Sequence, residues 1–215
     1  MNILAILLAY LLGSLPLGFI FLKIFKRLDL TTVGSGRTGG TNAMRAGGVW
    51  MGVLTGLSDM SKGYLAVLLA RLLVPEMIWV HILAGVLAVL GHNWSIWLFI
   101  FTRHFSAGAG TGPNIGAAMA FFPGMILFAV PTVLFFVFVV GYASVASIST
   151  AILVVIIFLI RALEYQYPWQ YVIYGVITLI LVTWALRPNI ERLLKGTERR
   201  VGIFARKQVN RIFRT

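Results

Sequence analysis

The feature that most restricts this chain is a long stretch without charge: no residue between Met125 and Ile160 is Asp, Glu, Lys or Arg. About 20 consecutive apolar residues suffice to cross the hydrocarbon core of a bilayer, so this stretch alone has room for two helical spans. Over the whole chain 60% of the residues are hydrophobic and only 11% are charged, whereas a soluble domain carries about a quarter charged residues. The sequence therefore predicts an all-α polytopic membrane protein.

Charges, prolines and glycine clusters divide the apolar sequence into about seven predicted transmembrane helices. They lie near residues 3–25, 49–74, 77–101, 107–122, 124–141, 148–163 and 169–186. The fourth is short and rich in glycine, which leaves open a tilted or partly re-entrant segment instead of a full crossing. The first apolar run lacks the features of a cleaved signal peptide and is predicted to remain as a span.

The formal net charge of +12 is concentrated in two clusters, one after the first span and one after Ala185. Basic residues beside apolar spans mark cytoplasmic loops and contact anionic lipid headgroups. This places the N-terminus outside and the C-terminus inside a cell (inner) membrane, with residues 26–48, 102–110, 142–147 and 187–215 on an active cytoplasmic face. A nucleic-acid partner is the competing explanation of so basic a chain and is not expected here.

Two parts of the chain are distinguished by their pattern. Residues 1–200 form a single predicted transmembrane domain. In residues 201–215 apolar side chains alternate with Arg and Lys, which is typical of an interfacial amphipathic helix. The chain has no cysteine and no metal-ligand spacing, so no metal or other cofactor is expected.

The first predicted cytoplasmic loop, residues 33–48, is dense in glycine, hydroxyls and guanidinium groups. Glycines allow successive backbone N–H groups to converge on an anion, and arginines add charge-assisted donors. The loop therefore predicts a cradle for a phosphate monoester, made by Ser35, Arg37, Thr38, Thr41, Asn42 and Arg45. It is not a P-loop, because no Gly-Lys-Ser/Thr sequence ends it. The alternative is a flexible loop whose arginines only enforce topology.

Among the ionisable residues inside the predicted spans, three are candidates for a functional role. Asp59 and Lys62 are three residues apart and so share a helix face. We expect a neutralising pair that fixes helix packing, with Lys62 also a candidate to act as a substitute cation in the site. His92 is a candidate general base, although a structural histidine that bonds a neighbouring group is the more frequent case. No Ser-His-Asp arrangement or paired carboxylates for acid–base chemistry are present.

The ordered motifs of the chain resemble a known family. Gly34-Ser35-Gly36, Gly39 and Thr41-Asn42 with Arg45 are followed by Asp59-Met60-Ser61-Lys62-Gly63, Leu90-Gly91-His92, Ser144-Val145-Ala146-Ser147-Ile148 and the run from Asn189 to Glu198. Together they look like the bacterial acyl-phosphate:glycerol-3-phosphate acyltransferases, small seven-span membrane enzymes that make lysophosphatidic acid for phospholipid synthesis.

The resemblance implies partners and site residues. It implies glycerol 3-phosphate, acyl phosphate and membrane phospholipid as partners, and no cofactor. The substrate-binding residues expected are Ser35, Arg37, Thr41, Asn42, Arg45, Gly108, Gly110, Ser144 and Asn189, and the catalytic candidates are Ser35, Arg45 and His92.

The chain departs from the family pattern at four positions. Ala109 stands where the second motif normally has lysine, and Leu186 and Pro188 stand where the third motif is expected to have histidine and glutamate. Arg37 replaces a residue that is usually Asn, and Arg37, Arg103 or His104 are candidates to supply the missing positive charge. Two other functions therefore remain open: a diverged or inactive paralogue that binds phospholipid or a partner, and a small transporter.

Overall fold

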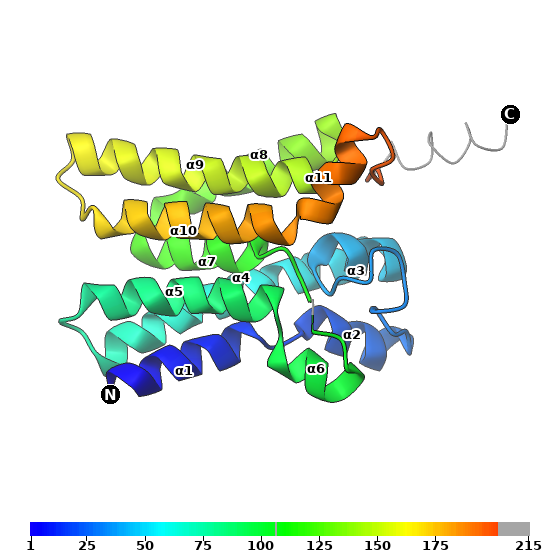
Figure 1. Cartoon of the computed structure of the whole chain (residues 1–215), viewed down its shortest axis with the longest axis horizontal. Helices are drawn as coiled ribbons and strands as arrows, with labels where there is room; N and C mark the ends of the chain where they lie inside the picture. Colours follow the sequence, from blue (N-terminus) through cyan, green and yellow to red (C-terminus); the bar gives the residue numbers. More distant parts are fainter. Residues whose placement is uncertain (106, 202–215) are drawn as a thin grey trace, which may run out of the picture.

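The computed structural model describes residues 1–105 and 107–201, and all regular secondary structure in these residues is helical. The longer helices run along one axis of the molecule (Figure 1). The predicted first span is broken into α1 (Asn2–Gly13) and α2 (Leu17–Lys26). Pro16 precedes α2, and it disfavours helical geometry at the residue before it. The span predicted near residues 3–25 is confirmed as an apolar stretch long enough to cross a membrane (Asn2–Lys26), although its helix is interrupted between α1 and α2.

The predicted cytoplasmic loop contains a helix of its own. Residues 33–39 are irregular, but α3 spans Gly40–Gly47 and is joined directly to α4 (Val49–Leu73). Gly48 makes the joint possible, because its φ of 90° lies in the left-handed region that favours glycine. The prediction of a helix over residues 49–74 is confirmed by α4. The prediction that residues 33–48 are non-helical throughout is wrong, because α3 lies within them.

The predicted third span is also two helices. α5 ends at Asn93, and α6 (Ile96–Thr102) starts anew after Ser95, whose hydroxyl accepts a hydrogen bond from the Leu98 N–H at 2.9 Å. This cap satisfies one of the otherwise unpaired amides of α6. Because α6 packs against α2 through Leu98 and Phe19, residues 77–101 do not form a single span: α5 begins at Ile78 and ends at Asn93.

α7 (Thr111–Phe121) is shorter than the predicted fourth span, because residues 107–110 are not helical. Eleven residues of α-helix extend only about 16 Å, about half the thickness of a hydrocarbon core. α7 packs very closely on α4: a Cβ atom at Gly116 would lie 1.8 Å from the Met60 carbonyl oxygen, and one at Gly63 would lie 2.2 Å from that of Pro113.

The second half of the chain forms an outer layer. A 3₁₀ turn (Pro123–Met125), α8 (Ile126–Phe135) and a π-helical turn (Phe136–Val140) follow one another, and then come α9 (Ala143–Glu164) and α10 (Gln170–Ala185). α9 begins five residues before the predicted span at 148, so residues 143–147 are its first turns instead of an irregular cytoplasmic connection. α11 (Arg187–Leu194) is bent by 62° from α10.

The helices that are long and apolar enough to cross a membrane number three among the described residues, or four if the bent pair α10–α11 is one span. The all-helical class is thus confirmed, while seven crossings and the orientation of the termini remain predictions. The predicted amphipathic tail lies outside the described residues apart from Val201.

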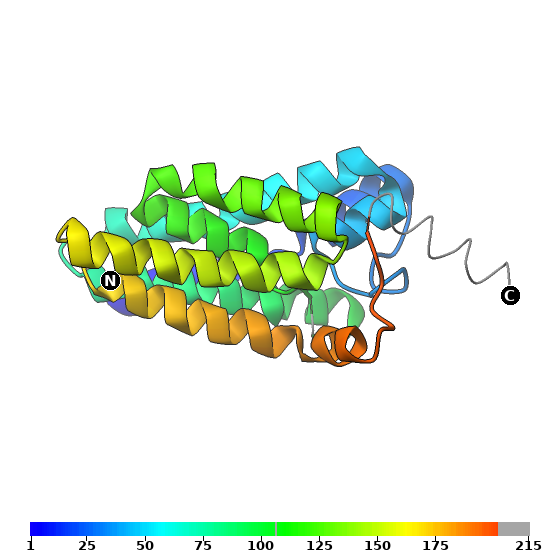
Figure 2. The ribbon, with the colours of Figure 1, turned by 90° about the horizontal axis from the view of Figure 1, so that it is seen from above.

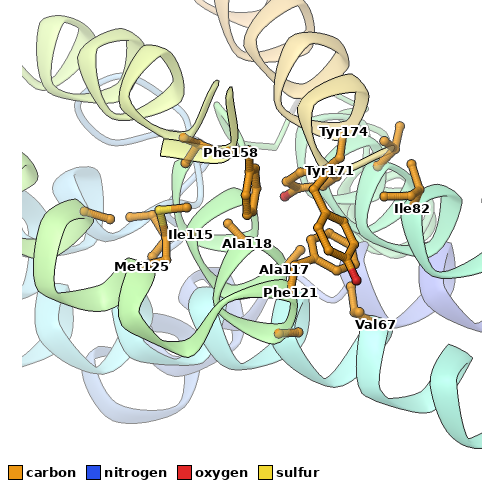
Figure 3. Packing of buried hydrophobic residues seen from close by; sticks show 14 residues of the cluster. Val67, Ile82, Ile115, Ala117, Ala118, Phe121, Met125, Phe158, Tyr171 and Tyr174 are labelled. Atoms are coloured by element: carbon orange, nitrogen blue, oxygen red, sulfur yellow. The ribbon is translucent and has the colours of Figure 1, made fainter. Parts of the chain in front are cut away.

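The apolar core is formed by side chains of α4, α5 and α7 together with side chains of α8, α9 and α10 (Figure 3). Phe121 of α7 stacks on Tyr171 at 4.7 Å between ring centroids, and Phe158 of α9 approaches Tyr171 at 5.7 Å. Away from this core, the short helices α2, α3, α6 and α11 gather at one end of the molecule (Figures 1 and 2). That end contains most of the irregular backbone predicted to carry the chemistry.

Candidate functional site

The irregular segment 33–39 is attached to a second irregular segment, residues 107–110. Both the backbone N–H and the hydroxyl of Thr38 donate to the Ala107 carbonyl, at 2.6 and 3.2 Å, and the Ala107 N–H donates to the Asn93 carbonyl at 3.0 Å. Thr38 is buried, and its bonds hold two parts of the site that are far apart in sequence. Thr38 thus connects the two irregular segments of the site.

Asn42 determines the shape of the glycine-rich loop. Its side-chain oxygen accepts from the Ser35 N–H at 3.0 Å, and its NH₂ group donates to the carbonyls of Val33 and Arg37, each at 2.9 Å. These bonds close a loop in which Gly34 and Gly36 have φ of 62° and 71°. The structure therefore places Asn42 as a buried organiser of the predicted cradle, with its amide engaged by the loop backbone.

The remaining cradle residues lie around α3. The exposed Ser35 precedes this helix, Thr41 lies in its first turn, where the helix dipole favours an anion, and Arg45 lies in its last turn. The Arg45 guanidinium donates to the carbonyls of Arg199 and Arg200 at 3.2 and 3.3 Å. Burial lowers the pKa of Arg45 and the charge of Arg199 lowers it further, while Glu198 opposes both effects.

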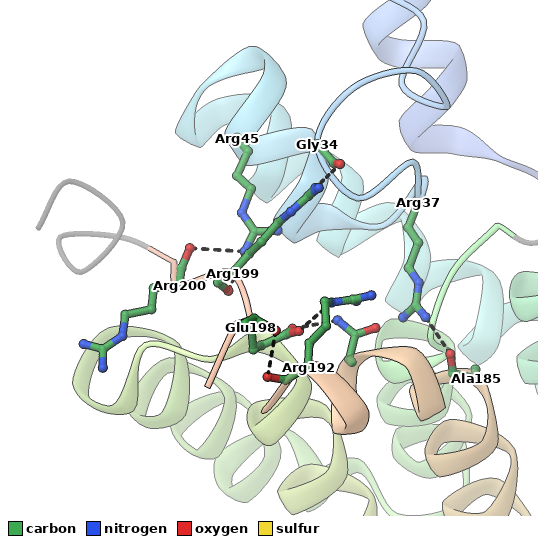
Figure 4. A network of polar contacts seen from close by, with 10 residues as sticks. Gly34, Arg37, Arg45, Ala185, Arg192, Glu198, Arg199 and Arg200 are labelled. Atoms are coloured by element: carbon green, nitrogen blue, oxygen red, sulfur yellow. Dashed lines mark hydrogen bonds and ion pairs between the residues drawn. The ribbon is translucent and has the colours of Figure 1, made fainter. Parts of the chain in front are cut away.

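Glu198 connects the C-terminal end of the described chain to this site (Figure 4). Its carboxylate accepts from the Asn189 NH₂ group at 2.7 Å and pairs with Arg192 at 3.0 Å. One residue later, Arg199 donates to the Gly34 carbonyl, so this segment crosses over the loop. The resemblance led us to expect a carboxylate at position 188, where Pro188 is exposed; a buried carboxylate is present next to Asn189, but it belongs to Glu198.

Two predicted substrate ligands have buried polar atoms without a partner among the described residues. These are the hydroxyl of Ser144, in the first turn of α9, and the side-chain oxygen of Asn189 in α11. An unpaired buried polar atom costs about 1–3 kcal/mol, so such atoms call for an explanation. Their positions suit the hydroxyl or phosphate groups of a small substrate.

His92, Asp59 and Lys62 form a separate buried cluster between α4 and α5. The Lys62 ammonium lies 3.0 Å from Asp59 Oδ1, and His92 Nδ1 lies 3.4 Å from the same oxygen. Gly108 lies against the other side of the ring, because a Cβ there would be 1.9 Å from His92 Nε2. Both ring nitrogens thus face protein groups, an arrangement that suits the structural role expected to be more frequent for such a histidine.

Two of the positions expected to depart from the family pattern share one apolar environment. Ala109 and Leu186 belong to the same cluster, together with Ala151 and Val182. Arg103 and His104 are exposed, whereas the Arg37 guanidinium donates to the Ala185 carbonyl at 2.5 Å, next to Leu186. Of the three candidates to supply the missing charge, the structure brings Arg37 beside the altered positions.

The sequence reasoning missed Glu198 and Arg192 as parts of the site, although both fall within the run that resembles the family. A signal was present in the pattern, since a Glu six residues after an Arg across a glycine-containing turn can fold back on it. Gly110, which was expected to bind substrate, has φ of 86° and approaches Asn93 closely. In the structure, the lack of a side chain at Gly110 allows its backbone to pack against Asn93.

Comparisons with known proteins agree on one family. The family model described as glycerol-3-phosphate acyltransferase matches residues 3–196. A glycerol-3-phosphate acyltransferase of Prochlorococcus marinus (strain MIT 9301) is 36% identical over 201 residues, which cover 94% of this chain and 98% of that protein. Glycerol-3-phosphate acyltransferase 2 of Moorella thermoacetica is 37% identical over 202 residues, with the same coverage of both chains.

Solved structures give the same result. The chain is similar to the crystal structure of PlsY (YgiH), an integral membrane glycerol 3-phosphate acyltransferase, in its glycerol 3-phosphate form, with a TM-score of 0.81 and 32% identity over 94% of this chain and 96% of that one. For the lysophosphatidic acid form of the same protein the TM-score is 0.81 and the identity is 30%, over 95% and 97% of the two chains.

The fold and the site together define an integral membrane acyltransferase. The chain belongs to the glycerol-3-phosphate acyltransferase family, and the resemblance predicted from its motifs is confirmed.

Proposed function

We propose that this protein transfers a fatty acyl group from acyl phosphate to glycerol 3-phosphate and releases lysophosphatidic acid into the membrane. The relatives named above are glycerol-3-phosphate acyltransferases, and the solved neighbours are described in glycerol 3-phosphate and lysophosphatidic acid forms. The observation that carries the proposal in this chain is the pair of unpartnered buried polar atoms, on Ser144 and Asn189. They lie in the segments whose motifs resemble the family.

In this proposal glycerol 3-phosphate is held by the cradle around α3. Its phosphate contacts Ser35, the first turn of α3 at Thr41 and the guanidinium of Arg45, and its hydroxyls are oriented by Ser144 and Asn189. Charge-assisted hydrogen bonds from arginine are the strongest of these contacts. Asn42 contributes by holding the loop in shape.

The reaction needs positioning and charge neutralisation more than an enzyme base. The acceptor hydroxyl oxygen attacks the acyl carbon, the bond from that carbon to the phosphate oxygen breaks, and the hydroxyl proton passes to the departing phosphate. Because both nitrogens of His92 face protein groups, the leaving phosphate itself is the proposed proton acceptor. Fixing two reactants against each other can supply several kcal/mol of the barrier reduction, up to about 7–11 kcal/mol in favourable cases.

The topology belongs to the same proposal. We infer seven crossings of a cell (inner) membrane, with the N-terminus outside and the site on the cytoplasmic face, and a single domain over residues 1–200 followed by an interfacial tail. The support is the gathering of α2, α3, α6 and α11 at one end (Figure 1) together with the basic residues in these segments. A cytoplasmic site fits a water-soluble acceptor and a membrane-borne donor.

The test is a transfer assay on purified protein in detergent. Radiolabelled glycerol 3-phosphate with palmitoyl phosphate is expected to yield lysophosphatidate, whereas palmitoyl-coenzyme A yields none. Arg45→Ala is expected to abolish the product, and Arg27→Ala, at an exposed arginine of the same end, serves as the matched control. Absence of product with every acyl donor would overturn the proposal.

A further inference from the structure

A cavity of about 180 Å³ opens beside the cradle, between the C-terminal end of α5 and the bend at which α10 meets α11. Its walls include the side chains of Arg37, Asn93, Trp94, Trp184 and Arg187. None of these except Arg37 was singled out by sequence reasoning as a binding residue. The Arg37–Arg187 pocket, as we name it, lies next to the position at which family histidine is replaced by Leu186.

The pocket carries two positive charges and no lining carboxylate. Arg37 donates to the Ala185 carbonyl at 2.5 Å, and Arg187 Nε donates to the Trp184 carbonyl at 3.3 Å. Both carbonyls belong to the last turn of α10, where the carbonyl groups lack the amide partners that they would have inside the helix. A guanidinium has five N–H donors, so these bonds fix the two groups in place and leave further donors for a ligand.

Arg37 is also poorly neutralised by its surroundings. Burial lowers the pKa of Arg37, and repulsion from Arg192 lowers it further, while Glu198 offsets only part of the effect. An anion placed between Arg37 and Arg187 would favour the charged form. A phosphate group fits, because planar guanidinium groups bind phosphate oxygens with two parallel hydrogen bonds.

Asn93 lines the pocket beside the two arginines. Its side chain is 1% exposed, and its Oδ1 atom has no hydrogen-bond partner among the described residues. Its NH₂ group is already directed to the Leu181 carbonyl at 3.4 Å. The Oδ1 oxygen lies close to Gly110, so Asn93 forms a fixed part of the pocket wall.

The outer wall of the pocket continues into an apolar surface along α10. Trp184 is 53% exposed, and the exposed side chains Ile173, Val176 and Ile180 precede it at helical spacing. From Ile173 to Trp184 the spacings are three, four and four residues, which aligns the four side chains on one face of the helix. The indole of Trp184, under the Arg187 guanidinium at 3.4 Å from its ring centroid, therefore joins a charged pocket to a hydrocarbon-compatible stripe.

We propose that the Arg37–Arg187 pocket binds the phosphate headgroup of a single-chain amphiphile whose hydrocarbon chain lies along the Ile173–Trp184 stripe. On the proposed function, on which this assignment of the ligand rests, the amphiphile is the acyl-phosphate donor. The water-soluble acceptor then occupies the separate cradle of Ser35, Thr41 and Arg45. Arg37 and Arg187 thus replace, at a neighbouring place, the positive charge that Ala109 lacks.

The binding test does not depend on turnover. Purified protein in detergent is titrated with hexadecyl phosphate, which cannot transfer an acyl group, and binding is followed by tryptophan fluorescence, because Trp94 and Trp184 line the pocket. Arg187→Gln is expected to raise the Kd about 10-fold or more, the effect of losing a charge-assisted bond. Arg45→Gln and the matched control Arg27→Gln are expected to leave it unchanged, as is the profile on size exclusion.

Parallel titrations identify the source of the phosphate. Hexadecanol tests the headgroup, and inorganic phosphate and glycerol 3-phosphate test the chain; all three are expected to bind at least about 10-fold more weakly than hexadecyl phosphate. Equal binding of inorganic phosphate would overturn an amphiphile site, and equal binding of hexadecanol would overturn a phosphate site. If Arg187→Gln does not remain monodisperse, Arg37→Gln makes the same comparison from the opposite wall.

Kinetics separate this inference from the proposed function. In the transfer assay Arg187→Gln is expected to raise the KM for palmitoyl phosphate about 10-fold with the KM for glycerol 3-phosphate unchanged. Transfer with both KM values unaffected by Arg187→Gln would sink the pocket assignment and leave the proposed function intact. If the native protein transfers nothing but Arg187→Gln still weakens hexadecyl phosphate binding, the pocket stands and the proposed function falls.

Discussion

Lys62 and Asp59 form an ion pair at 3.0 Å in the middle of the helix bundle, and each side chain is less than 6% exposed. The Lys62 ammonium also donates to the Leu15 carbonyl at 2.8 Å, in the break between α1 and α2, where that oxygen also accepts from the Leu17 N–H at 3.0 Å. The pair thus neutralises two buried charges and fastens a broken helix to α4. The break near Pro16 thus exposes a carbonyl group to which the buried Lys62 ammonium can donate.

The first prediction concerns this pair. Lys62→Met leaves the buried Asp59 carboxylate without its ammonium partner and removes one hydrogen bond from the Leu15 carbonyl. We expect it to lower the free energy of unfolding by about 3–5 kcal/mol. The double variant Asp59→Asn with Lys62→Met removes the orphaned charge and should cost less than Lys62→Met alone. Thermal unfolding in detergent measures both. A double variant as unstable as the sum of its singles would show that the two charges are not coupled.

The second prediction tests the close contact of α7 with α4. A Cβ at Gly116 would lie 1.8 Å from the Met60 carbonyl oxygen, whereas one at Gly56 on the same α4 helix meets nothing within 4 Å. Gly116→Ala must push the helices apart and should destabilise by about 2 kcal/mol or more, while Gly56→Ala should be neutral or stabilise by up to about 1 kcal/mol. Comparable melting temperatures for the two variants would contradict the contact.

These two cases show what the sequence could and could not reveal. Composition and apolar runs predicted an all-helical membrane protein and the extent of α4, because burial in lipid leaves few other ways to satisfy the backbone. The same runs missed the interruptions at Pro16 and Ser95, since side chains on both sides of each break remain apolar. The helix ends at these breaks depend on partners distant in sequence. At the first break the Lys62 ammonium donates to the Leu15 carbonyl, and at the second the Ser95 N–H donates to the Phe105 carbonyl.

The candidate site divides in the same way. Motif content located the loop, Arg45 and Asn189, because glycine, hydroxyl and arginine density is local information. The direction of a side chain is not local: Asn42 was expected to face substrate, but its amide bonds the loop that surrounds it. Glu198 and Arg187 reach their positions only through the bend after α10 and the return of the chain over Gly34.

The third prediction follows from the role of Asn42. Asn42→Asp keeps the size of the side chain but removes the NH₂ group that donates to the Val33 and Arg37 carbonyls. The loop should lose its shape, and kcat/KM for glycerol 3-phosphate should fall about 10-fold or more. Thr32→Val, at an exposed residue outside the cradle, is the control. Unchanged kinetics in Asn42→Asp would show that the loop does not need these bonds.

The fourth prediction concerns the paired departures at Ala109 and Leu186, which share one apolar cluster with Ala151 and Val182. Ala109→Lys brings an ammonium group into that cluster without a partner and should destabilise the protein by about 1–3 kcal/mol. Ala109→Met, which adds similar length without charge, should cost less. Adding Leu186→His gives the lysine a polar neighbour, so the double variant should be more stable than the sum of the single effects predicts. Melting temperatures in detergent measure all four variants, and strict additivity would show that the two positions changed independently.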